Sequence, residues 1–385
     1  MNSLLSNVSK IQDQMAQWRH QIHQNPEPGF GEVKTAELVA SLLKSWGYEV
    51  ITGIGKTGVV ASLKAGKGEK IIGLRADMDA LPVTEQVESA YKSSVEGRMH
   101  ACGHDGHTAM LLGAGKYLSE NRNFNGTVRL IFQPAEEIMG GAPAMIQDGI
   151  LERFPMDAIF GMHNMPTLEQ GKLFFRSGPM MAAVDNWEVE LTGQGSHGSM
   201  PERSIDPIVA GSSLVMALQT VVSRNVAPLQ PAVVSVGAFL AGDAGNVIPQ
   251  KAILRLSIRS MTQATRDLVL GRVRAIIGAQ AQTFGVTYEL REGTPGAILI
   301  NDDAQTAFAA QVAKNLLGEE KVSTEGATYM GSEDFAFFTQ KKPGTYCMIG
   351  NGDTPMVHNP MYAFDDKNLS IGAAYWVALT QAFLK

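Results

Sequence analysis

Apolar residues in the first 184 positions form two kinds of pattern, continuous runs typical of buried strands and the spacing typical of amphipathic helices. The helical spacing predicts helices over residues 7–24, 32–46, 106–119 and 142–150. The apolar runs predict strands over residues 58–64, 70–76, 127–133 and 158–162. Strands that alternate with helices favour an α/β fold, an α/β/α sandwich with a largely parallel mixed sheet.

The middle of the chain has a different order of elements. Its pattern predicts, in sequence, a strand, a helix, two strands, a helix and a strand over residues 187–192, 205–223, 232–239, 253–259, 265–284 and 286–291. This β-α-β-β-α-β order is that of a small ferredoxin-like α+β domain. We therefore expect such a domain over residues 185–294.

After residue 295 the first pattern returns. It predicts helices over 304–317, 333–339 and 367–383 and a strand over 345–349. The simplest interpretation is one α/β domain formed by residues 1–184 and 295–385, with the smaller domain inserted into it. Insertions are tolerated where the two attachment points lie close together.

Composition narrows the class of protein. The chain has 385 residues, of which 44% are hydrophobic and 18% charged, as expected for a globular protein with a large core. The net charge of −6 offers no basic surplus for nucleic acid. No apolar stretch reaches the length of a membrane span, and the first residues do not resemble a secretory signal. With only two cysteines, Cys102 and Cys347, we expect no disulfide framework and a cytoplasmic location.

The densest group of reactive side chains is the HACGHDGH segment at residues 100–107. It brings three His, one Cys and one Asp into eight residues. Imidazole and thiolate are the preferred ligands of zinc-like divalent ions. The alternative is a polar helix start in which Asp105 is a capping residue and Cys102 is simply buried.

Glu136 and Glu137 follow a strongly apolar strand, at the end of the sheet where α/β active sites gather. Two adjacent carboxylates need a cation or a proton to relieve their repulsion. One could bind a metal while the other moves protons, or both could cap the next helix. His163 follows another apolar strand and His358 lies in a loop; a single His in either position is more often a structural residue. Together, the four segments predict a metal centre assembled by the fold.

Several of these motifs resemble a known family. The segments GLRADMDALP at 73–82, HACGHDGH at 100–107, QPAEE at 133–137 and GMHN at 161–164 resemble metallo-amidohydrolases of the aminoacylase and hippurate hydrolase kind. That branch includes plant indole-acetyl-amino-acid hydrolases and bacterial N-acetyldiaminopimelate deacetylases. It is related to the dinuclear-zinc peptidases of the carboxypeptidase G type. The resemblance covers nearly the whole chain.

The resemblance implies a role for each matched residue. Glu136 would be the catalytic carboxylate of a centre that holds two divalent ions (Zn, Mn, Co or Ni). The implied metal ligands are Cys102, His104, Glu137, His163 and His358. Asp77 would orient a ligand or the base. The related dipeptidases carry a His at the position of Arg75. For Asp79 we favour a residue of a simple turn at the end of a strand over a role in the site.

In the inserted domain, GQGSHG at 193–198 resembles a family motif whose His polarises the scissile carbonyl. By this resemblance His197 is a catalytic residue. Asn246 and Arg259 would bind the carbonyl or carboxylate of the substrate, although a hairpin Asn and a surface Arg are equally consistent. The family also implies that the inserted domain serves as a lid and forms a homodimer or higher homo-oligomer.

The function that follows is hydrolysis of N-acyl amino acids, such as acetyl or benzoyl derivatives, to an acid and a free amino acid. In this mechanism metal-activated water attacks the amide and Glu136 acts as general base. A dipeptidase or exopeptidase on the same centre is the alternative within enzymes. From another class, a non-catalytic metal-binding protein remains, but a purely structural site has no use for Glu136.

Overall fold

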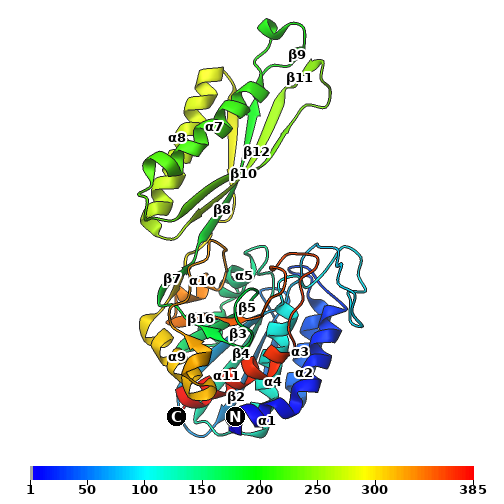
Figure 1. Cartoon of the computed structure of the whole chain (residues 1–385), viewed down its shortest axis with the longest axis vertical. Coiled ribbons are helices and arrows are strands. Elements are labelled where there is room, and N and C mark those ends of the chain that lie inside the picture. The colour runs from blue at the N-terminus through cyan, green and yellow to red at the C-terminus, as the bar shows by residue number, and fades with distance from the viewer. Residues whose placement is uncertain (1–2) are drawn as a thin grey trace. The chain divides into compact units, whose positions relative to one another are not determined.

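The computed structural model describes residues 3–385, and contacts within the chain divide it into two compact units (Figure 1). The first unit is formed by residues 3–178, 300–327 and 334–385. The second unit is formed by residues 179–299 and 328–333. The roles predicted for the two parts, catalysis for one and a lid or dimerisation surface for the other, stay predictions.

The first unit is built on a mixed eight-stranded sheet with the order β1-β2-β4-β3-β5-β16-β6-β15. Its four central strands run parallel and are β4 (Gly126–Gln133), β3 (Ile71–Asp77), β5 (Ala158–Met165) and β16 (Gly344–Gly350). The outer strands are β1 (Glu49–Ile54), β2 (Gly58–Ala65), β6 (Leu173–Phe174) and β15 (Val322–Ser323). The predicted α/β class with a large, largely parallel sheet is confirmed. The parallel strands bring their carboxyl ends to one edge, where a site can form.

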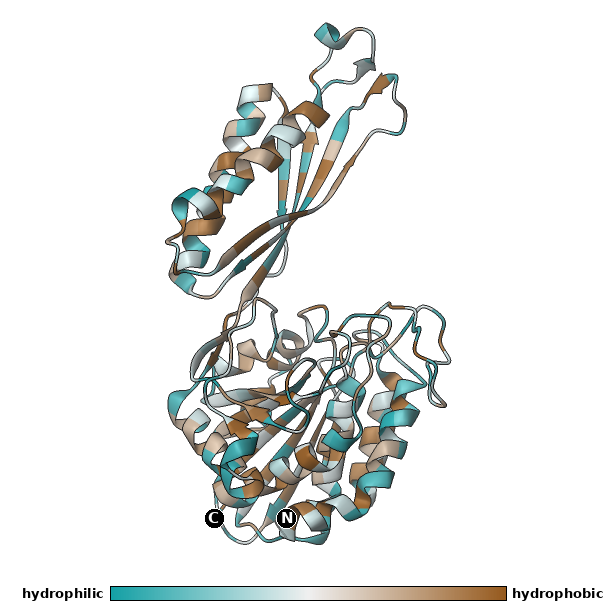
Figure 2. Ribbon diagram, in the orientation of Figure 1, coloured by the Kyte–Doolittle hydropathy of each residue, from teal (hydrophilic) through white to brown (hydrophobic). Residues whose placement is uncertain are grey.

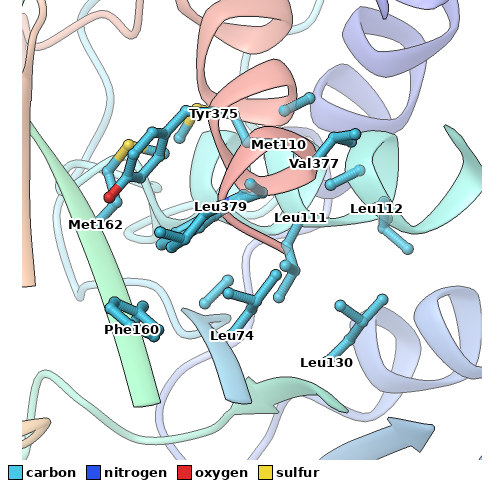
Figure 3. Packing of buried hydrophobic residues seen from close by; sticks show 14 of the residues in the cluster. Leu74, Met110, Leu111, Leu112, Leu130, Phe160, Met162, Tyr375, Val377 and Leu379 are labelled. Carbon is cyan, nitrogen blue, oxygen red and sulfur yellow. The ribbon is translucent and has the colours of Figure 1, made fainter. Parts of the chain in front are cut away.

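Helices cover both faces of this sheet because the central strands are apolar on both sides. On one face, Leu74 and Phe160 pack against α4 (His104–Glu120) and α11 (Lys367–Phe383), as Figure 3 shows. Beside these two helices lie α1 (Ser3–Val8), α2 (Gln12–His23), α3 (Val33–Ser45) and α9 (Asp303–Leu317).

The opposite face of the sheet is covered by short helices. There Gly161 faces the rings of Tyr346 and Phe335, because alternate residues of a strand point to opposite faces. The helices on this side are α5 (Gly141–Gln147), α6 (Ile150–Arg153) and α10 (Ala336–Thr339). Figure 2 shows apolar residues concentrated along the large sheet, with mixed colours on the surface helices.

The second unit has the β-α-β-β-α-β order. Its elements are β8 (Ala183–Thr192), α7 (Pro207–Asn225), β10 (Ala232–Ala241), β12 (Lys251–Ser260), α8 (Gln263–Phe284) and β13 (Thr287–Glu292). The four strands pair antiparallel in the order β10-β12-β8-β13, which leaves β10 and β13 at the edges. Its own core includes Trp187, Leu214, Leu254 and Val273.

Short elements complete the chain. These are the strands β7 (Gly178–Met181), β9 (Ser196–His197), β11 (Val247–Ile248) and β14 (Leu299–Asn301), and the 3-10 turns at Ser9–Ile11, Pro201–Arg203 and Glu319–Lys321. Among residues 3–385, no helix combines the length and the apolar character needed to cross a lipid bilayer.

Candidate metal centre

The predicted metal ligands meet at the carboxyl ends of three neighbouring parallel strands. Asp77 ends β3, Glu136 and Glu137 follow β4, and His163 lies near the end of β5. Cys102 and His104 lie at the start of α4, and His358 comes from a loop after β16.

Of the five groups of potential ligand atoms found in residues 3–385, three overlapping groups contain the predicted ligands, with the atoms of each group within 4.8 Å of one another. The groups are Cys102, His104 and His163; Cys102, Glu137 and His358; and His104, Glu136 and Glu137. The fold therefore brings together all five residues predicted as ligands and the carboxylate predicted as base.

Hydrogen bonds fix which nitrogen of each buried histidine faces this centre. The Nδ1 of His104 lies 3.1 Å from Oδ1 of Asp79, and the Nδ1 of His163 lies 2.5 Å from the carbonyl oxygen of Asn164. Each Nδ1 therefore carries a proton, and each Nε2 is the nitrogen that can bind a metal in the neutral imidazole. The Nε2 of His163 lies 3.3 Å from Sγ of Cys102.

Two buried polar atoms at the centre have no hydrogen-bond partner within residues 3–385, namely Nε2 of His104 and Oε1 of Glu137. They lie 3.9 Å apart, and each such atom costs about 1–3 kcal/mol when left unsatisfied. A divalent cation would satisfy both. The donor set of thiolate, imidazole and carboxylate fits a zinc-like ion.

The local charge points to the same conclusion. Burial and the carboxylates of Glu137 and Glu136 raise the pKa of the Cys102 thiol well above its usual value. Burial, reinforced by Asp79 and opposed by His104, raises the pKa of Glu137 to about 7. A bound cation would reverse both effects, because it stabilises thiolate and carboxylate in their ionised forms.

Asp79 has a larger role than the sequence suggested. Its Oδ1 accepts a hydrogen bond from Nδ1–H of His104, and its Oδ2 accepts one from the backbone N–H of Glu137 at 2.9 Å. The interpretation of Asp79 as a simple strand-end turn is wrong, because one carboxylate fixes two ligand residues. The sequence shows only that Asp79 follows a strand, whereas the structure shows that its carboxylate binds His104 and the backbone of Glu137.

Asp77 is fully buried on the other side of the His104 ring. Its carboxylate lies 2.6 Å from Nδ1 of His107, 2.6 Å from Nη1 of Arg75 and 3.8 Å from Nε2 of His104. Burial opposes the charge of Asp77, but His104, Arg75 and His107 outweigh it and lower the pKa of Asp77 well below its usual value. Asp77 therefore stays ionised next to the centre.

The turn that carries the two glutamates is held by a residue that sequence reasoning missed. Glu32 is fully buried, and its Oε1 accepts the backbone N–H of Ala135 at 2.8 Å while its Oε2 accepts the hydroxyl of Thr57 at 2.6 Å. Ala135 has a positive φ of 52°, so the chain turns sharply just before Glu136. No local signal marks Glu32, since its partner is more than a hundred residues away.

His358 is the exposed member of the set, with a side chain that is 54% accessible. Its backbone N–H donates to the carbonyl of Ala101 at 2.7 Å, and its Nε2 lies 3.4 Å from Oε2 of Glu137. Burial and the nearby His104 lower the pKa of His358, which favours the neutral form that binds metals.

The remaining predicted residues lie in the second unit. His197 is exposed on β9, and Asn246 is its neighbour through the bond from the N–H of Gly198 to the Asn246 carbonyl at 2.8 Å. Arg259 is half-buried on β12 and donates to the carbonyl of Met330 at 2.7 Å. Their predicted roles toward a substrate stay predictions.

Known proteins resemble this chain over its whole length. A hippurate hydrolase from Campylobacter jejuni is 46% identical over 383 residues and matches 100% of both chains. An N-acetylcysteine deacetylase from Bacillus subtilis is 37% identical over 369 residues, covering 95% of this chain and 96% of the relative.

Solved structures agree with these relatives. The crystal structure of the Bacillus subtilis YXEP protein, described as a dinuclear metal binding peptidase from the M20 family, superposes with a TM-score of 0.83. It is 32% identical and covers 98% of this chain and 99% of its own. The sequence profile of peptidase family M20/M25/M40 matches residues 73–382. This chain therefore belongs to peptidase family M20/M25/M40.

Proposed function

We propose that this chain is a metal-dependent amidohydrolase that cleaves N-acyl amino acids, such as acetyl or benzoyl derivatives, to a carboxylic acid and a free amino acid. One observation carries the proposal: a further buried carboxylate, Glu136, lies beside a full set of ligands. Relatives named as a hippurate hydrolase and an N-acetylcysteine deacetylase support the substrate class.

The residues proposed to hold two divalent ions are Cys102, His104, Glu137, His163 and His358. When bound, such ions supply Lewis acidity that makes water nucleophilic near neutral pH and polarises the amide carbonyl. Among these residues Cys102 would supply a thiolate, which is a preferred ligand of zinc-like ions.

Glu136 is proposed to move the proton. It accepts a proton from the attacking water and then delivers it to the leaving nitrogen, which would otherwise depart as an unstable anion. Its neighbour Glu137 is proposed as a metal ligand instead. Asp79 accepts the backbone N–H of Glu137, and the carboxylate of Glu137 lies beside His104 and His358.

His197 is proposed to stabilise the oxyanion. The Nδ1 of His197 accepts the backbone N–H of Ser199 at 3.1 Å, so its proton resides on Nε2, from which it can donate to a carbonyl oxygen. A single donor of this kind contributes about 3–4 kcal/mol in other enzymes. Asn246 and Arg259 are proposed to contact the carbonyl or carboxylate of the substrate.

A dipeptidase or exopeptidase remains the second candidate, since the structural relative above is described as a peptidase. The test compares hippurate and N-acetyl amino acids with simple dipeptides, before chelation and after re-addition of Zn, Mn, Co or Ni. We expect the protein to hydrolyse the acyl amino acids. This activity should be lost when a chelator removes the metal and should return when metal is added back. Faster cleavage of dipeptides would favour the peptidase, and activity that survives chelation would contradict both.

We also propose that the second unit forms a homodimer. Strand β10 lies at the edge of its sheet, and the outer face of α7 beside it carries exposed apolar side chains, including Val209 at 51% and Met216 at 70% accessibility. Unpaired strand edges flanked by apolar residues are ready sites for pairing with a second copy.

A further inference from the structure

Asn164 has no part in the roles proposed above, yet it lies where the segments that carry the ligands meet. It directly follows His163 near the end of β5 and is fully buried. We infer that Asn164 is a positioning residue whose side chain holds these segments in place for metal binding. The inference rests on the proposed metal centre.

The side-chain amide of Asn164 joins two segments directly. Its Nδ2 donates to the carbonyl of Cys102 at 2.7 Å, and its Oδ1 accepts the hydroxyl of Tyr362 at 2.6 Å. Its backbone carbonyl accepts Nδ1–H of His163 at 2.5 Å. One residue thus sets the backbone position of Cys102 and the ring orientation of His163.

His107 connects Asn164 to a third segment. The Nε2 of His107 accepts the backbone N–H of Asn164 at 3.0 Å and lies 3.1 Å from its Nδ2. The ring proton of His107 must therefore be on Nδ1, which lies 2.6 Å from the carboxylate of Asp77. The start of α4 and the end of β3 are thereby fixed to the end of β5.

Tyr362 brings in the loop of His358. It lies four residues after His358, whose own backbone N–H donates to the carbonyl of Ala101. The loop that carries His358 is therefore held at Ala101, just before Cys102, and beside Gly103, just after it. The approach is close: a Cβ at Gly103 would lie 2.3 Å from Nδ2 of Asn164 and 2.5 Å from the Tyr362 hydroxyl.

The amide of Asn164 suits these bonds because it carries its donor, Nδ2, and its acceptor, Oδ1, on two separate atoms of one short side chain. An aspartate at this position would place a carboxylate oxygen against the Cys102 carbonyl and the lone pair of His107. An alanine would leave the Cys102 carbonyl without this donor. Either change should displace Cys102 and weaken metal binding.

The test measures Co²⁺ binding by Asn164→Asp and Asn164→Ala, using chelator competition and the thiolate-to-cobalt absorption band. We expect affinity to fall by about 10- to 100-fold, the usual loss when a partner of a metal ligand is removed, with a shifted band. Tyr362→Phe, which removes one hydroxyl, should lose less. Asn301→Ala is the matched control, since that buried amide donates to the carbonyls of Arg176 and Tyr346.

The outcomes separate this inference from the proposed function. Wild-type affinity and band in the Asn164 variants, or an equal loss in Asn301→Ala, would overturn the positioning role. A wild-type protein with no thiolate band would overturn the metal centre itself. If the Asn164 variants do not fold, unchanged Co²⁺ affinity in Tyr362→Phe would still refute the inference.

Discussion

The carboxylate of Asp79 decides which nitrogen His104 presents to the proposed metal centre. It holds the Nδ1 proton of His104 with one oxygen and the backbone of Glu137 with the other. An imidazole held in this way is a better ligand because its tautomer and its orientation are both set before metal binds.

Asp79→Asn tests that role. The amide keeps an acceptor for His104 but turns an NH₂ group toward the backbone N–H of Glu137, so two donors oppose each other. We expect zinc affinity to fall about 10- to 100-fold in competition titrations. Asp157→Asn, at the opposite end of β3, is the control because Asp157 also accepts a backbone N–H, that of Ile71. Equal losses in both variants would argue against a specific role.

A second buried group of charges lies at the end of α2. The Nδ1 of His23 lies 2.8 Å from the carboxylate of Asp105, and its Nε2 lies 3.2 Å from Glu85. Arg19 also binds Asp105, at 2.9 Å. Burial and Arg19 oppose a charge on His23, but the carboxylates prevail and raise the pKa of His23 to about 9.

This shift makes a signed prediction for stability. Because the folded pKa of His23 is above its unfolded value, the stabilisation is complete below about pH 6.5 and is lost as pH rises through about 9. The difference in unfolding free energy between wild type and His23→Gln should therefore shrink by up to about 3 kcal/mol from pH 6 to pH 10. Urea unfolding at each pH measures it, and a constant difference would refute the ion pairing.

Side-chain chemistry explains how much of the site the sequence could predict. Cys102, His104, Glu137, His163 and His358 carry recognisable ligand groups after strands or in loops. Glu32 and Asp79 carry only ordinary carboxylates, and their importance depends on which distant backbone groups they reach. Asn164 was equally invisible, because an Asn beside a His has no distinctive pattern.

The start of α4 depends on a glycine in a left-handed conformation. Gly103 has a φ of 89° and directly precedes His104. Gly103→Ala should cost about 1 kcal/mol for the conformation and considerably more for the clash with Asn164. Gly97→Ala is the matched control, since Gly97 has a φ of 71° with nothing within 4 Å of an added Cβ. Equal losses of unfolding free energy in the two variants would show that the contact is unimportant.

Long periodic elements were predictable and short ones were not. The helix predicted over 367–383 is observed as Lys367–Phe383, because a long apolar stripe leaves little doubt about its extent. Strand β1 was missed, since it is short, half-exposed and interrupted by Gly53. The predicted helix over 333–339 begins only at Ala336.

The first helix shows a further limit of periodicity. The apolar spacing over 7–24 predicted one helix, but a 3-10 turn at Ser9–Ile11 separates α1 from α2. A tightened turn keeps nearly the same face buried, so the spacing of apolar residues cannot reveal it.

For the whole molecule, the alternation of strands and helices correctly predicted the large mixed sheet.

The proposed pairing of two copies of the chain depends on surface residues that no sequence pattern marks. Replacing Val209 and Met216 together by Glu should convert the proposed dimer to a monomer, because charges oppose burial of that surface. Light scattering after gel filtration measures the mass. Met361→Glu, at an exposed methionine of the first unit, is the control. A wild-type monomer, or a double variant that stays dimeric, would contradict the proposal.

The central claim is that Glu136 moves protons while Glu137 binds metal. The most direct measurement is the metal content and turnover of hippurate by Glu136→Gln and Glu137→Gln. We predict that Glu136→Gln keeps the wild-type metal content and loses about 10²- to 10⁴-fold in kcat, whereas Glu137→Gln loses metal. Substantial turnover by Glu136→Gln, or loss of metal in that variant alone, would contradict the account.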